Sequence, residues 1–105
     1  MDKASVRRNL VKFRKALEAE GIREPRLILF GSHAHGRPRR DSDIDVVAIS
    51  HDFNGRDLWE RIEILSEAIL KSHPLIEAVA LTPKEWDNEE SIFVEFARDG
   101  IEIAA

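Results

Sequence analysis

The chain has 105 residues, of which 34% are charged, with 16 lysines and arginines against 20 aspartates and glutamates and a formal net charge of −4. This length fits one domain, the acidic balance excludes broad coating of nucleic acid, and the absence of cysteine excludes disulfides and thiolate metal sites. No segment approaches the roughly 18 consecutive apolar residues of a membrane span, and residues 1–10 lack an apolar signal core. We therefore expect one cytoplasmic domain over residues 1–105, with no membrane contact.

Two apolar patterns recur along the chain. Apolar residues spaced by three and four predict amphipathic helices, and short apolar runs bounded by glycine or proline predict buried strands. In chain order these patterns predict a helix over 2–20, strands over 26–30 and 44–49, a helix from 57 up to the pair at 73–74, a strand over 75–81, a helix that begins at 82–85, a short helix over 91–98 and an edge strand over 101–103. The long irregular connection over 33–42 is of the kind that usually carries function.

Two aspartates open the second predicted strand. Because side chains alternate along a strand, Asp43 and Asp45 point to one face, while Ile44 turns into the core on the other. Two carboxylates held this close repel each other, and one takes up a proton unless a cation lies between them. Oxygen ligands of this kind suit Mg²⁺ or Mn²⁺, whose coordination is usually completed by substrate phosphates. The pair therefore predicts a metal site that works on a nucleotide.

The first predicted strand ends in Gly31 and Ser32. A glycine here lets the backbone come close to a ligand, and the N–H groups of the following turn favour an anion such as a triphosphate. Ser32 adds a hydroxyl donor, and the arginines of the next loop are near enough to assist: Arg37, Arg39 and Arg40. A Walker loop is excluded, because Arg37-Pro38 stands where that motif requires Lys and Ser or Thr.

Gly31-Ser32, ten further residues and then Asp43-Ile44-Asp45 resemble the G-S-x10-D-x-D signature of the polymerase-β-like nucleotidyltransferase superfamily, specifically its minimal nucleotidyltransferases. The resemblance covers most of the chain. It implies an α+β fold, in which a small mixed sheet packs against helices. This architecture agrees with the element order predicted above.

The resemblance also implies a chemistry. Asp43 and Asp45 would ligate two Mg²⁺ ions, with Mn²⁺ as the alternative metal, and Gly31, Ser32 and Arg40 would hold the triphosphate. By order along the chain, Glu77 would be the third catalytic and metal-binding carboxylate, which helps to activate the attacking hydroxyl. Relatives usually carry Asp there, and an acid on an edge strand can also lack any function, so both readings of Glu77 stay open.

Minimal nucleotidyltransferases are commonly paired with helical proteins of the HEPN class, as the antitoxin of the pair. The resemblance therefore implies that this chain is such an antitoxin and transfers AMP from ATP, or another NMP from its NTP, to a hydroxyl of a HEPN-type partner. Two alternatives stand beside it. The chain could bind a nucleotide and neutralise its partner by occlusion, or it could be a nucleotidyltransferase with a small-molecule or RNA acceptor. We expect no direct nucleic-acid binding, and the sequence leaves a homo-oligomer open.

Two further residue pairs have competing interpretations. His33 and His35 stand where many relatives carry Arg; a zinc site would need a third ligand, and we expect contact with phosphate or solvent instead. Trp59 and Trp86 fall in helical patterns, and we expect them to pack against the helices or the core rather than to stack on a base.

Overall fold

The computed structural model of this chain describes residues 1–36 and 42–104. In this part of the chain the elements, in order, are α1 (Lys3–Ala19), β1 (Arg26–Phe30), β2 (Ile44–Ile49), the 3₁₀ turn η1 (His51–Phe53), α2 (Leu58–Leu70), β3 (Ile76–Leu81), α3 (Pro83–Asp87), α4 (Ile92–Ala97) and β4 (Ile101–Ile103). The predicted helices and strands are confirmed to within a residue or two at their ends, and η1 is an addition to them.

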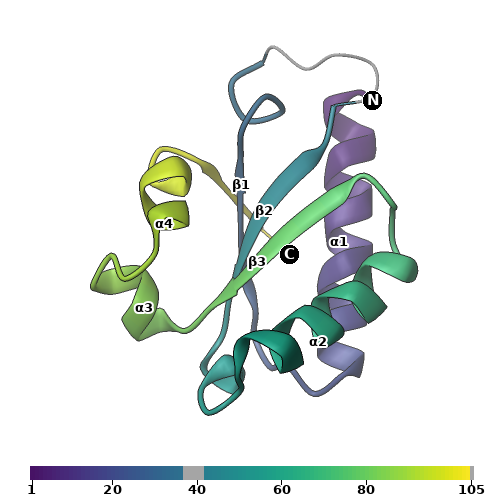
Figure 1. The fold of residues 1–105 in the computed structure, drawn as a ribbon. Helices are drawn as coiled ribbons and strands as arrows, with labels where there is room; N and C mark the ends of the chain where they lie inside the picture. The colour runs from purple at the N-terminus through teal and green to yellow at the C-terminus, as the bar shows by residue number, and fades with distance from the viewer. Residues whose placement is uncertain (37–41, 105) are drawn as a thin grey trace.

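The strands form one mixed sheet in the order β3-β2-β1-β4. β1 pairs antiparallel with both β2 and β4, whereas β2 and β3 run parallel. A parallel pair needs a crossover connection, and α2 provides it between β2 and β3 (Figure 1). The mixed sheet packed against helices confirms the α+β fold.

Helices cover both faces of the sheet (Figure 1). α1 and α2 bury their apolar side chains against the face that carries Leu27, Ile44 and Val46. α4 covers the other face, where Val94 packs against Val47. The central strands β1 and β2 are therefore apolar on both sides, as their near-continuous apolar sequences require.

The helix ends follow local rules that are visible in the sequence. The Asp2 side chain caps α1 by accepting a hydrogen bond from the N–H of Ser5 at 2.8 Å, and Gly21 follows the helix with a φ of +88°. The predicted capping box at the start of α2 is present, with Asp57 and Glu60 satisfying each other's backbone N–H groups. None of the helices in the described residues combines the length and apolar character that crossing a membrane requires.

The packing predicted for Trp59 is wrong, because 71% of this residue is exposed. It lies in the first turn of α2, and the helix crosses over β3, which is an edge strand with a single neighbour. Beyond that edge, nothing in the described chain covers the first turn of the helix. Trp86 does pack against the apolar cluster beneath α4, which confirms the prediction for that residue.

Candidate active site

Three carboxylates meet where β2 and β3 begin. The parallel register places Asp45 of β2 beside Glu77 of β3, and Asp43 lies just before β2. Ile44 is fully buried among the side chains beneath α1 and α2, so the alternation predicted for this stretch is confirmed. The three acids consequently lie on the opposite face of the sheet, the one that α4 covers further along.

The pKa values show that these acids interact. Burial raises the pKa of Asp45 above its usual range, and the negative charge of Asp43 raises it further. The pKa of Glu77 is also raised, chiefly by the charge of Asp43, then by burial and by the charge of Asp45. Asp45 and Glu77 therefore each carry an electrostatic cost that a bound proton or a nearby cation would relieve.

Gly31 lies directly against this group of acids. Its φ is +74°, a left-handed conformation that glycine adopts without steric cost. A Cβ placed on Gly31 would come within 2.3 Å of Oδ2 of Asp45, so a larger residue would occupy the space of the carboxylate. The residue therefore brings the turn after β1 into contact with the acids, because it has no side chain.

The turn after β1 contains Ser32 and closes on itself. The N–H groups of Ala34 and His35 donate to the carbonyl oxygen of Gly31 at 3.1 and 3.2 Å. Ser32 is half-buried in this turn. The structure thus brings together Gly31, Asp45 and the other two acids, whereas Arg40 and its neighbours Arg37 and Arg39 lie outside the described residues.

His33 occupies a place that the sequence did not indicate. It is only 8% exposed, and its Nε2 lies 3.2 Å from the carbonyl oxygen of Ser42. Because a carbonyl oxygen only accepts, Nε2 carries the proton in this contact. The expected contact with solvent is wrong for His33, which instead ties the turn to the residue before Asp43. Contact of His33 with phosphate stays a prediction. His35 is exposed, as expected.

Two of the acids suit a divalent metal. Within residues 1–36 and 42–104, no three or more His, Cys, Asp or Glu side chains form a group that could hold a metal ion by themselves. Mg²⁺, however, is usually bound by only one or two carboxylates, with substrate phosphates and waters completing its shell. The donor chemistry of Asp43 and Asp45 fits that requirement, and the role of Glu77 as a further ligand stays a prediction.

Comparison with known proteins decides the family. The family model described as "Nucleotidyltransferase domain" matches residues 10–98, a range that contains the turn, all three acids and every strand except β4. The chain belongs to the nucleotidyltransferase domain family. The family supports a transferase that moves nucleoside monophosphate groups.

The fold has a relative of known structure. A crystal structure described as a "putative nucleotidyltransferase" from Sulfolobus solfataricus superimposes on this nucleotidyltransferase domain with a TM-score of 0.57, at 18% sequence identity, covering 97% of this chain and 87% of that chain. Identity this low supports the shared fold alone. No curated protein sequence matches the chain significantly.

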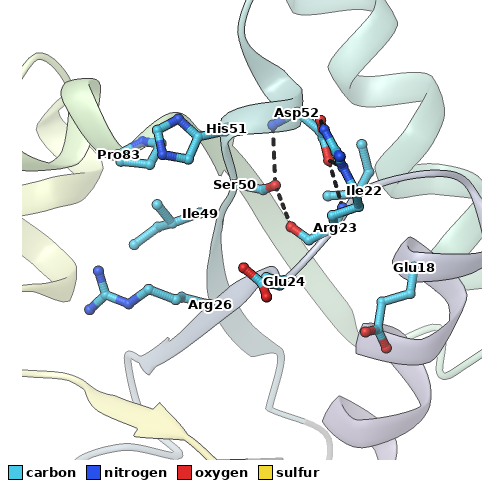
Figure 2. A pocket seen from close by; sticks show the side chains of 10 residues that line it. All are labelled: Glu18, Ile22, Arg23, Glu24, Arg26, Ile49, Ser50, His51, Asp52 and Pro83. Carbon is cyan, nitrogen blue, oxygen red and sulfur yellow. Dashed lines mark hydrogen bonds and ion pairs between the residues drawn. The ribbon is translucent and has the colours of Figure 1, made fainter.

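The nucleotidyltransferase domain has a hollow of about 830 Å³ at the far end of β2, about 20 Å from Asp43. Figure 2 shows how its polar groups are engaged: Ser50 donates to the carbonyl of Arg23 and accepts from the N–H of Asp52, while the Arg23 guanidinium pairs with the Asp52 carboxylate. That pairing lowers the pKa of Asp52 to about 2. These bonds link the segment before β1 to η1, so we assign this region a structural role.

Proposed function

We propose that this nucleotidyltransferase domain transfers a nucleoside monophosphate, AMP from ATP, to a hydroxyl group of a partner protein in a metal-dependent reaction. The observation that carries the proposal is the contact between Gly31 and Asp45, because it sets the turn proposed to hold the triphosphate against the acids proposed to hold a metal. If the turn and the acid pair lay apart, the turn could bind a phosphate and the acids a cation, each by itself. Their contact suits a triphosphate that is bound together with its metal ion.

In the proposed reaction, the acceptor hydroxyl oxygen forms a bond to the α-phosphorus of ATP. The bond between that phosphorus and the oxygen leading to the β-phosphate breaks, and pyrophosphate leaves. The hydroxyl proton passes to a carboxylate, and Glu77, which the strand register places beside Asp45, is the proposed acceptor. Two Mg²⁺ ions held by Asp43 and Asp45, with Glu77 beside them, would supply the charge that stabilises the attacking and departing oxygens.

The partner is proposed from the resemblance to the minimal nucleotidyltransferases. A HEPN-type helical protein would carry the acceptor hydroxyl, and this chain would be the antitoxin of the pair. Gly31 and Ser32 would hold the triphosphate.

The experiment is to incubate the protein with ATP, Mg²⁺ and the product of the neighbouring gene, and to weigh that product by intact-mass spectrometry. We expect a mass gain of adenylyl units. Asp43→Asn and Asp45→Asn should abolish the gain without loss of secondary structure. Asp87→Asn, which removes an exposed acid at the end of α3, beyond the opposite end of β3 from Glu77, should leave it intact. No gain with any nucleotide would count against transfer to a protein.

One observation favours a second candidate, an antitoxin that keeps the nucleotide site but acts by occlusion. Glutamate at position 77 is one methylene longer than the aspartate that relatives usually carry, which changes where the oxygens of the third carboxylate lie. If the double variant Asp43→Ala, Asp45→Ala protects cells from the partner as well as the parent does, occlusion explains the function. Nucleotide transfer without any partner protein would instead point to a small-molecule or RNA acceptor.

A further inference from the structure

The two aspartates of the candidate active site are held in different ways. Asp45 lies within the sheet, paired with Phe30 of β1 on one side and with Glu77 of β3 on the other. Asp43 lies just before β2, outside both of these pairings. The hydrogen bonds between strands therefore fix the position of Asp45, whereas the position of Asp43 depends on the contacts that its own neighbours in the chain make.

Two hydrogen bonds, one on each side, hold the chain around Asp43. On the side of the strand, the N–H of Ile44 donates to the carbonyl oxygen of Leu75 at 2.8 Å. On the side of the preceding connection, the carbonyl oxygen of Ser42 accepts from Nε2 of His33 at 3.2 Å. The first bond joins two backbone groups, but the second depends on the type of one side chain. A substitution of His33 can therefore remove the second bond and keep the groups that make the first.

His33 can fix the carbonyl group of Ser42 because its own position is restricted. The side chain is buried, and the turn that carries it is closed by the N–H groups of Ala34 and His35, which both donate to the carbonyl oxygen of Gly31. A buried side chain on a closed turn has few rotamers open to it. The hydrogen bond from the imidazole therefore sets where the chain lies immediately before the first aspartate.

We infer that His33 is a positioning residue: it holds the chain before Asp43 through the carbonyl group of Ser42, so that the Asp43 carboxylate meets a metal-bound triphosphate beside Asp45. The inference rests on the proposed function, because Asp43 matters here as the proposed metal ligand. Residues that orient metal ligands from behind are common in metal sites, and their loss typically lowers metal affinity or activity about 10–100-fold.

Three variants of the full chain separate the hydrogen bond from the volume of the buried ring. His33→Leu removes the donor and keeps an apolar side chain in its place, whereas His33→Gln keeps an N–H donor on a side chain of similar reach. Ser50→Ala is the matched control. Ser50 is 4% exposed, and its hydroxyl donates to the carbonyl oxygen of Arg23 at 2.8 Å, beyond the opposite end of β2 from Asp43. This control loses a buried bond to a backbone carbonyl group, remote from the acids.

The first measurement needs no ligand. Hydrogen exchange followed by NMR reports how often the N–H of Ile44 opens, and the N–H of Val47, in the middle of β2, serves as the reference for a general loss of stability. We expect His33→Leu to raise the exchange rate of Ile44 relative to Val47 about fivefold or more. The ratio should stay within about twofold of the parent in His33→Gln and in Ser50→Ala.

The second measurement is the affinity for a nucleotide with its metal. Calorimetry gives the Kd of the Mn²⁺ complex of an ATP analogue with a methylene group between the α- and β-phosphates, which cannot release pyrophosphate. We expect His33→Leu to raise this Kd about 10–100-fold, and His33→Gln to restore most of the loss. Ser50→Ala should stay within about twofold of the parent. A role of His33 in stability alone would not produce this pattern, because a general loss of stability would also raise the exchange of Val47.

Several results would overturn the inference. A Kd in His33→Leu equal to that of the parent would show that the hydrogen bond has no bearing on the site. A raised Kd with unchanged exchange at Ile44 would show that His33 contacts the phosphate directly. Failure of His33→Gln to restore both readouts would show that the ring itself, rather than its hydrogen bond, is required. If His33→Leu fails to fold, His33→Phe, which keeps a ring without a donor, takes its place.

Failure of the proposed function gives a different result. A parent protein that shows this dependence on residue 33 in both measurements, but transfers no nucleotide to any acceptor, would remove the proposed function and support the inference. A parent protein that transfers nucleotide as well as His33→Leu does would support the proposed function and overturn the inference.

Discussion

Replacing Gly31 by alanine tests the contact on which the candidate active site depends. The change adds one methyl group at a position where the backbone φ is +74° and where Oδ2 of Asp45 lies 2.3 Å from the place of the new Cβ. Two separate penalties follow. One is backbone strain in the left-handed region, and the other is displacement of a carboxylate that is proposed to bind metal.

The two penalties have different sizes and different readouts. A non-glycine residue in the left-handed region costs about 1–2 kcal/mol, and each kcal/mol lowers the Tm of a domain of about this size by roughly 4–8 °C. The contact itself is with the end of a flexible side chain, so Asp45 can rotate away at a cost of only about 0.5–1.5 kcal/mol. A displacement of about 1 Å at a reacting centre, however, lowers a rate about 100-fold.

Gly21→Ala is the matched control. Gly21 has a φ of +88° and nothing within 4 Å of a built Cβ, so this variant carries the backbone strain without the contact. We expect urea unfolding to show that Gly31→Ala and Gly21→Ala lose similar stability. Calorimetry with ATP and Mg²⁺ and the transfer assay should then show a large loss in Gly31→Ala alone.

Equal retention of ATP binding and transfer in the two variants would refute the reasoning, because it would mean that the position of the Asp45 carboxylate has no bearing on the site. A loss in Gly21→Ala as large as that in Gly31→Ala would refute it as well, since stability alone would then explain the effect.

Three further predictions follow from the same structure. Glu77→Gln should raise the Tm at pH 7, by the equivalent of about 0.2–1 kcal/mol of unfolding free energy, because it removes a like charge across neighbouring strands. Since the folded pKa of Glu77 is raised, the stability of the parent falls as pH rises through that pKa, and the gain of the variant should vanish below about pH 4. A variant no more stable than the parent at pH 7 would contradict this prediction. Asp52→Asn should lower the Tm at pH 7, because the variant loses the ion pair with Arg23 that holds the folded pKa of Asp52 at about 2. This stabilising effect is lost as pH falls from about 4 towards that value, so thermal melts across this range should show a shrinking difference in Tm between the variant and the parent. Phe13→Ala should cost about 3–5 kcal/mol in urea unfolding, since Phe13 is fully buried in the core beneath α1, and a loss below 1 kcal/mol would mean that this core is not packed as described.

Local residue patterns were enough to predict the elements and their ends. The pair Asp57 and Glu60 marks the start of α2 because a capping box needs only residues three apart. Gly21 marks the end of α1 because a helix terminates readily in a left-handed residue. The family fold agreed with these elements, and the mixed sheet confirms it.

Part of the candidate site followed from the same local rules. Asp43 and Asp45 share a face because strand side chains alternate, and buried Ile44 between them confirms it. The contact of Gly31 with Asp45, by contrast, requires β1 to lie beside β2 in one particular register. The contact of His33 also depends on the tertiary structure, since its partner Ser42 is nine residues away in the sequence. The catalytic and metal-binding roles of these residues stay predictions.

The sequence by itself determined where the helices and strands begin and end, and which side chains share a face, because both depend on residues within a turn of helix or two steps of strand. Only the tertiary structure decided that Glu77 lies beside Asp45 and that Leu58 and Trp59 stay exposed beside β3. An apolar stripe shows that a helix has a face to bury, but whether another element covers that face depends on the order of the strands. That order is set by the packing of the whole chain.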